Sequence, residues 1–289
     1  STPGGASGLT DTATNASVVL TLESGQVVGR AGSGGPIVFV VSVNASGQVT
    51  LDQQRAVVHT DTTDPDDSRG LTGSNLVVLT ASAFDKDGDS ASAPLDLTPL
   101  LVFKDDGPSI SASATGAPTL TVDESVLGTN DTKGYSAQFS PTFGNDGAGA
   151  VPTTYALSTP GGGSGLTDTA TNTGVVLSLE AGQVVGRAGA GGPVVFVISV
   201  DAAGQVTLDQ QRAIVHADTT NPDDSRGLTG SNLVVLTAVA HDKDGDTASA
   251  PLDLTPLLAF KDDGPTAAIT LGAGSVVHDE TPGVQTAAS

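Results

Sequence analysis

Apolar residues fall in short runs along the chain, and Gly, Pro and Asp residues typical of turns separate these runs. No stretch shows a convincing helical period of 3.6 residues, so long helices are not expected. Runs rich in Val, Leu and Thr predict β-strands instead. The predicted strands of one complete unit cover residues 119–122, 153–157, 175–179, 193–200, 205–208, 233–240 and 247–254.

Two turns between these strands have the length of a hairpin connection. Residues 201–204 (Asp-Ala-Ala-Gly) and 242–246 (Asp-Lys-Asp-Gly-Asp) each join two predicted strands. Short strands joined by regular turns are typical of an antiparallel sandwich, and the predicted fold class is therefore all-β. The unit is longer than a minimal immunoglobulin domain, so extra strands or long loops are expected.

An internal repeat is the strongest signal in the sequence. Residues 1–106 match residues 158–263 without a gap, at a spacing of 157 residues, the difference between 85 and 242. The run Leu-Asp-Gln-Gln-Arg-Ala, for example, occupies residues 51–56 and again residues 208–213. The sequence therefore predicts a tandem array of similar units.

The units of this array are unequal. Residues 277–281 resemble residues 121–125, which indicates that another unit begins after Pro265. We expect the array to continue beyond both ends of the sequence. The predicted domains, all immunoglobulin-like antiparallel β-sandwiches, are a truncated first repeat (1–106), a complete second repeat (107–263) and the start of a third repeat (264–289).

Composition narrows the classes of function. The chain has no Cys, which excludes disulfides and thiolate chemistry. Its net charge of −21 argues against nucleic acid and anionic membranes as direct partners. No apolar run has the length needed to span a bilayer. A large extracellular protein without disulfides needs another means of stabilisation, and bound hard cations are the obvious one.

The acidic residues are clustered in turns. Asp85, Asp87 and Asp89 alternate in the first copy of one turn, and Asp242, Asp244 and Asp246 are their equivalents in the second. Several carboxylates in a tight turn can supply part of the six to eight oxygens that Ca²⁺ requires. The turn is not an EF-hand, because Ser90 stands where that loop needs Gly.

The segments between repeats supply further carboxylates. Asp105 and Asp106 end the first repeat, and Asp262 and Asp263 end the second. In an immunoglobulin-like sandwich the last hairpin turn lies where the chain enters the domain, so residues 242–246 should face Asp105 and Asp106. Two more carboxylates, at the end of an early strand, are candidates for additional ligands: Asp123 and Glu124.

This many close carboxylates cannot all stay ionised without compensation, and a divalent cation would provide it. The interpretation is that Ca²⁺ binds at these acidic junctions. The alternative is a solvated turn followed by an ordinary Asp-Gly-Pro linker.

A second acidic loop, residues 61–67, recurs at residues 218–224, with Asn221 in place of Asp64. Both calcium binding and a simple Asx-turn tolerate this exchange, and the two interpretations stay open. No nucleophile–base pair, pair of catalytic carboxylates or phosphate loop stands out, so an enzyme is not expected.

Three motifs in matching order resemble the extender repeats of giant bacterial RTX adhesins. They are the Val-Thr-Leu-Asp-Gln-Gln-Arg-Ala run (49–56, 206–213), the Asp-Lys-Asp-Gly-Asp turn and the Lys-Asp-Asp-Gly-Pro junction. The resemblance covers essentially the whole chain. It implies tandem calcium-dependent sandwiches, exported by type I secretion and used in surface attachment and biofilm formation. It also implies that Asp85, Asp87 and Asp89 bind calcium together with a linker upstream of residue 1.

The expected function is therefore a calcium-stabilised spacer that holds a binding domain away from the bacterial cell surface. Its partners would be neighbouring repeats of the same chain, in a monomeric extracellular array. The alternative is a calcium-dependent adhesion module that binds a glycan or another cell surface. Sugar-binding sites usually stack on aromatic rings, and the chain has two Tyr and no Trp, which weakens this alternative.

Overall fold

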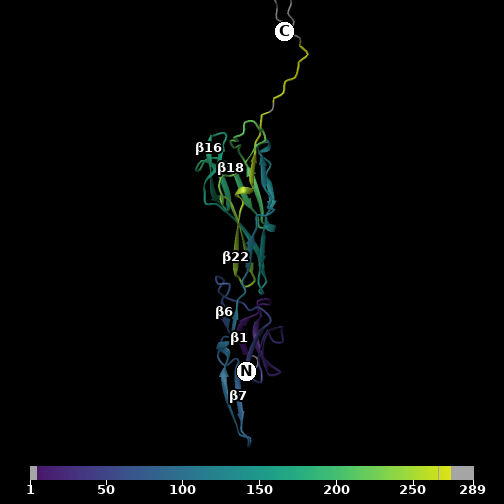
Figure 1. Ribbon diagram of the computed structural model, residues 1–289, viewed down its shortest axis with the longest axis vertical. Coiled ribbons are helices and arrows are strands. Elements are labelled where there is room, and N and C mark those ends of the chain that lie inside the picture. Colours follow the sequence, from purple (N-terminus) through teal and green to yellow (C-terminus); the bar gives the residue numbers. More distant parts are fainter. Residues whose placement is uncertain (1–4, 266, 275–289) are drawn as a thin grey trace, which may run out of the picture.

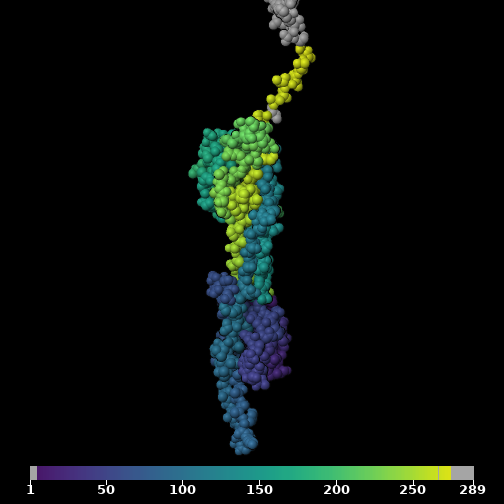
Figure 2. Space-filling model, in the orientation of Figure 1, coloured from purple at the N-terminus to yellow at the C-terminus, as the bar shows by residue number. Residues whose placement is uncertain are grey.

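The computed structural model describes residues 5–265 and 267–274, and it is all-β. The predicted third repeat lies, from residue 275 onward, outside the described residues. We keep the name first repeat for residues 5–106 and second repeat for residues 107–263. The two follow one another along the long axis of the molecule (Figures 1 and 2).

The first repeat contains nine strands and one short 3₁₀ helix. They are β1 (Gly5–Thr10), β2 (Ser17–Glu23), β3 (Gln26–Ala31), β4 (Ile37–Val43), β5 (Val49–Gln53), β6 (Ser68–Gly70), β7 (Val78–Phe84), β8 (Ser90–Asp96), η1 (Thr98–Leu100) and β9 (Val102–Lys104). Strands β1 to β5 form an antiparallel sheet in sequence order, while β6 pairs with β9 and β7 with β8.

The second repeat repeats these elements and adds five strands before them. The added elements are β10 (Ser109–Ala112), β11 (Leu120–Asp123), η2 (Glu124–Val126), β12 (Asp131–Gly134), η3 (Ser136–Gln138), β13 (Phe139–Thr142) and β14 (Ala148–Ser158). The shared elements are β15 (Gly162–Asp168), β16 (Thr173–Glu180), β17 (Gln183–Ala188), β18 (Val194–Val200), β19 (Gln205–Gln210), β20 (Ser225–Arg226), β21 (Val235–Asp242), β22 (Thr247–Asp253), η4 (Thr255–Leu257) and β23 (Leu258–Lys261).

The strands of the second repeat form two packed layers. One is a six-stranded antiparallel sheet in the order β12-β19-β18-β17-β16-β15, and the other contains the sheet β14-β21-β22, whose strand β14 packs on β17 and β18. Strand β11 departs from the predicted antiparallel arrangement, because it pairs parallel with β23. Both predicted hairpins are confirmed, since β18–β19 and β21–β22 are antiparallel pairs across short turns.

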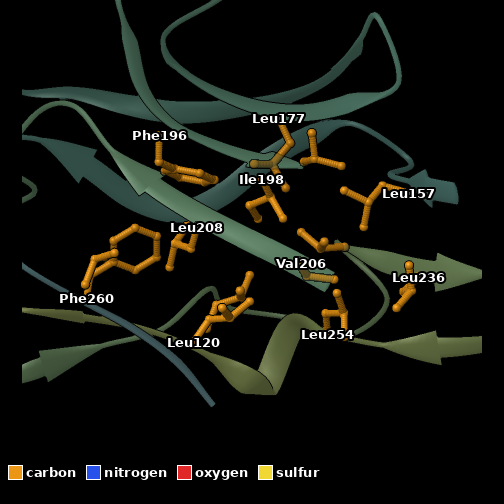
Figure 3. Close-up of a cluster of buried hydrophobic side chains, with 14 of the residues drawn as sticks. Leu120, Leu157, Leu177, Phe196, Ile198, Val206, Leu208, Leu236, Leu254 and Phe260 are labelled. Carbon is orange, nitrogen blue, oxygen red and sulfur yellow. The ribbon is translucent and has the colours of Figure 1, made fainter. Parts of the chain in front are cut away.

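Alternation along the strands explains how the core forms. Strand β21 has every second residue buried, which places its apolar side chains between the layers. Leu236 of β21, Ile198 of β18 and Val206 of β19 are fully buried there (Figure 3). At one end of this core the rings of Phe196 and Phe260 pack with centroids 5.1 Å apart. The core thus uses aliphatic residues with Phe as filler, as the composition predicts.

Among the described residues, no helix combines the length and apolar character needed to cross a membrane.

Candidate metal centre

The turn of the β21–β22 hairpin points at the first repeat (Figure 1). Its shape is fixed by the backbone, because Asp242 N–H donates to the Asp246 carbonyl (3.2 Å) and Gly245 adopts a φ of 114°. The Asp242 carboxylate also accepts hydrogen bonds from Gly245 N (3.1 Å) and Asp246 N (2.7 Å) through one oxygen. Its other oxygen is left to face the neighbouring acidic groups.

Five carboxylates from three segments converge at this turn, and we call them the junction cluster. They are Asp105, Asp146, Asp242, Asp244 and Asp246. In one group, carboxylate oxygens of Asp105, Asp146 and Asp244 lie within 4.8 Å of one another. In a second group, which shares Asp244, the same holds for Asp242, Asp244 and Asp246. Each of the five side chains has one buried oxygen without a hydrogen-bond partner.

The surroundings of the cluster disfavour negative charge. Burial raises the pKa of Asp146 to about 6, and repulsion from Asp244 and Asp105 adds to the shift. Burial and Asp244 raise the pKa of Asp242 to about 6, while burial and Asp105 raise the pKa of Asp246 to about 8. Two unit charges at about 4.8 Å repel by roughly 3.5 kcal/mol at an effective dielectric constant of about 20. The ionised cluster therefore needs a counter-charge.

The first repeat contributes more than Asp105 to this junction. The backbone N–H of His59 donates to Asp244 Oδ2 (2.9 Å), and the buried His59 ring contacts Asp67 through Nδ1. Across the junction, Lys243 Nζ donates to the Ala13 carbonyl (2.6 Å). The cluster is thus assembled from two repeats and exists only where they meet.

The exit end of the second repeat has a related group. His216, Asp224 and Asp262 are the equivalents of His59, Asp67 and Asp105, and Glu124 joins them. The ring of His216 lies 2.6 Å from Asp224 Oδ1 and 3.4 Å from Glu124 Oε1, without hydrogen-bond geometry to either. Desolvation raises the pKa of Glu124, which accepts hydrogen bonds from Gln210 Nε2 and Ile214 N (both 2.8 Å).

The structure does not bring Asp123 or Glu124 to the junction with the first repeat. The parallel pairing of β11 with β23 places Asp123 opposite Lys261, so the segment ends where the chain leaves the second repeat. Asp123 there accepts a hydrogen bond from Ser125 N (2.9 Å). The sequence pattern could not distinguish the parallel from the antiparallel pairing.

Other predicted ligands face solvent. Asp106 is exposed and accepts hydrogen bonds from the backbone and side-chain nitrogens of Asn145 (3.0 and 2.8 Å). Asp263 is also exposed. The turn with Asp85, Asp87 and Asp89 forms a carboxylate group of its own, but all three residues are exposed.

The 61–67 loop has the geometry of Asx-turns. Asp61 Oδ1 accepts hydrogen bonds from Thr63 N (3.1 Å) and Thr63 Oγ1 (2.6 Å), and Asp64 Oδ1 accepts one from Asp66 N (3.2 Å). In the second repeat Asn221 Oδ1 accepts the equivalent bond at 3.2 Å. The carboxylates of Asp61 and Asp64 are thus used within the loop.

Sequence reasoning missed Asp146 and His59. Asp146 lies in Gly-Asn-Asp-Gly before β14, which resembles an ordinary turn. His59 carried a usable signal, since His216 occurs at the repeat spacing. Both residues are buried at the junction, with 6% and 4% of their surface exposed.

The junction cluster fits a hard divalent cation. All its ligand atoms are carboxylate oxygens, which suit Ca²⁺ and Mg²⁺ rather than softer metals. Ca²⁺ tolerates irregular coordination by six to eight oxygens, whereas Mg²⁺ demands a near-ideal octahedron. The five orphaned oxygens, from two repeats and three segments, are an irregular set of this kind.

Comparison with known protein families identifies the family of most of the chain. The family model described as "Domain of unknown function (DUF5801)" matches residues 1–98 and 119–255, more than half of the chain. No curated protein matches the chain.

Proposed function

The chain belongs to the DUF5801 family, a domain of unknown function, and from its junction cluster we propose that it forms calcium-stabilised structural repeats of a large extracellular adhesin. The repeats would be immunoglobulin-like spacers that project a binding domain from a bacterial cell surface. Their role would be attachment and biofilm formation, with export by type I secretion, as the resemblance of the sequence motifs implies.

The observation that carries this proposal is the set of orphaned carboxylate oxygens shared by two repeats. Asp105 comes from the end of the first repeat, and Asp146 and the 242–246 turn come from the second. A bound cation would neutralise charges that otherwise repel, and it would do so only when the repeats are aligned. Calcium would thus stiffen the junction in addition to stabilising each repeat.

Calcium availability would control where the array becomes rigid. Calcium that binds the folded junction stabilises the folded state by mass action. The gain is about 4 kcal/mol when the free calcium concentration is a thousand times Kd. Calcium is scarce inside cells, so the chain would remain unstiffened before export. The extended, head-to-tail order of the repeats in Figure 2 suits a monomeric spacer.

The position of the 61–67 loop favours a spacer over the alternative of a ligand-binding module. Gly107 N donates to the Pro65 carbonyl (3.1 Å), and a Cβ added at Gly245 would lie 3.1 Å from Thr62 Cγ2. The loop thus packs at the junction between repeats, where it supports their alignment.

Small-angle X-ray scattering tests the proposal. The maximum dimension should be larger, and the spread of conformations narrower, in millimolar calcium than in chelator, with magnesium giving a smaller effect. Asp244→Asn, which keeps the side-chain volume, should weaken the response, whereas Asp87→Asn, its equivalent in the exposed turn, should not. The same maximum dimension with calcium and with chelator would refute calcium-dependent stiffening.

A further inference from the structure

A histidine with two orphaned ring nitrogens lies at the exit end of the second repeat. The His216 side chain is 4% exposed, and among the described residues neither ring nitrogen has a hydrogen-bond partner. Burying a polar group without a partner costs free energy, so such a group needs an explanation. The junction cluster gives none, because it lies where the chain enters the repeat and shares no residue with this group.

A strand pairing brings two carboxylates to this ring. Strand β11 pairs parallel with β23, with Asp123 opposite Lys261. Glu124 and Asp262 are the next residues along the chain, so the pairing brings them together. One carboxylate oxygen of each and one ring nitrogen of His216 lie within 4.8 Å of one another. The three groups come from three separate segments of one repeat.

Hydrogen bonds hold these segments in place. Glu124 Oε1 accepts hydrogen bonds from Gln210 Nε2 and from Ile214 N, both at 2.8 Å. The backbone N–H of Asp262 donates to the Asp224 carbonyl (2.9 Å). All of these contacts lie within the second repeat, so the group forms without a neighbouring repeat.

The spacing of the side chains suits two ligands of one ion. His216 Nε2 lies 3.4 Å from Glu124 Oε1 without hydrogen-bond geometry. Two ligands of a tetrahedral Zn²⁺ ion are about 3.4 Å apart when each bond is about 2.1 Å long. The other ring nitrogen, Nδ1, lies 2.6 Å from Asp224 Oδ1. A carboxylate beside the second nitrogen is the usual partner of a metal-bound histidine.

The donor set differs from that of the junction cluster. Imidazole nitrogen suits Zn²⁺ and similar transition-metal ions, whereas Ca²⁺ prefers oxygen ligands. The alternative without a metal is a protonated His216 between the carboxylates of Glu124 and Asp224. That arrangement would direct an N–H group at each carboxylate, but neither contact has hydrogen-bond geometry.

We propose that His216, Glu124 and Asp262 form a site for Zn²⁺ or a similar transition-metal ion. Asp262 is only half-buried, so a water molecule can reach the ion and complete the tetrahedron. The ion would tie the ends of β11 and β23 to the segment after β19. It would thus stabilise the exit end of a repeat that has no cysteine. The site uses different residues from the calcium proposal and stands apart from it.

Zinc titration of the full chain by calorimetry, in millimolar calcium, tests the proposal. His216→Ala and Glu124→Gln should each weaken one zinc-binding step by at least about tenfold. His241→Ala is the matched control, because that ring contacts Thr154 (3.0 Å) and belongs to no metal-ligand group in the described part of the chain. It should change zinc affinity by less than about twofold.

NMR of the imidazole rings in the parent chain tests the site without any variant. Zinc should shift the ring resonances of His216 and leave those of His241 unchanged. Absence of a zinc-binding step, or zinc binding that leaves the His216 resonances in place, would overturn the proposal. Unchanged zinc affinity in both His216→Ala and Glu124→Gln would also overturn it. Neither readout depends on calcium binding at the junction, so the two proposals can fail separately.

Discussion

The same five residues, Asp-Lys-Asp-Gly-Asp, form two turns with different properties. In the first repeat Asp85 is exposed, and hydrogen bonds from Asp87 and from backbone N–H groups lower its pKa. In the second repeat its equivalent Asp242 is 3% exposed, with a pKa raised to about 6 by burial. The turn motif alone therefore does not determine whether its carboxylates form a buried site.

One ion pair within the shared residues is the same in both repeats. Arg55 Nε lies 2.8 Å from Asp11, and Arg212 Nε lies 2.8 Å from Asp168. Both pairs use an arginine of the Leu-Asp-Gln-Gln-Arg-Ala run. The repeats differ where residues 107–157 and the first repeat meet the second copy of the turn. Burial by these neighbouring segments therefore creates the junction cluster.

The largest expected effect in this comparison concerns Leu252 and its equivalent Leu95. Leu252→Ala should destabilise the second repeat by about 3 kcal/mol, because it leaves a cavity in a packed layer. Leu95→Ala should cost less than about 0.5 kcal/mol, because that side chain is already exposed. Urea unfolding followed by tyrosine fluorescence measures the first change, since Tyr135 and Tyr155 both lie in the second repeat.

Circular dichroism measures the effect of Leu95→Ala, because it includes the strands of the first repeat. A loss of stability as large as that of Leu252→Ala would show that the Leu95 side chain is buried, contrary to the structure.

An intermediate effect is expected from pH in the absence of cations. Asp146, Asp242 and Asp246 have folded pKa values of about 6 to 8, above the unfolded value of 3.8. The folded state therefore binds more protons than the unfolded state across this range, and stability should fall as pH rises from about 4 to about 8. Urea midpoints in chelator, followed by tyrosine fluorescence, measure this fall.

The double variant Asp242→Asn, Asp246→Asn should show a flatter pH profile. A parent profile that rises between about pH 5 and pH 8 would contradict the electrostatic account of the junction.

The smallest effect is expected from Asp64→Asn. Asn221 already makes the equivalent Asx-turn hydrogen bond in the second repeat, so stability should change by less than about 0.5 kcal/mol. Calorimetric calcium affinity should change by less than about twofold if Asp64 is not a ligand. A clear loss of affinity would instead support calcium binding by the 61–67 loop.

The sequence predicted those parts of the fold that depend on local pattern or on the repeat. Short apolar runs predicted the strands around 193–200 and 205–208, and the turns predicted both hairpins. The sandwich argument also placed the 242–246 turn beside Asp105, which is where the structure has it.

Long-range pairing could not be read from the sequence. Nothing in the run Leu120–Asp123 indicates that it pairs parallel with β23, and this pairing carries Glu124 away from the junction. Asp146 was missed for a similar reason, because a Gly-rich turn shows no sign of the acidic group it will face. Burial, which separates the two acidic turns, depends on segments distant in sequence.

Calcium titration by calorimetry tests the central claim most directly, with two variants of equal charge change. One variant replaces Asp242, Asp244 and Asp246 by Asn, and the other replaces Asp85, Asp87 and Asp89 by Asn. We predict that the first variant loses the tightest calcium-binding step, whereas the second retains it. Loss of that step in both variants alike, or no calcium binding by the parent chain, would contradict the claim that calcium binds at the junction between repeats.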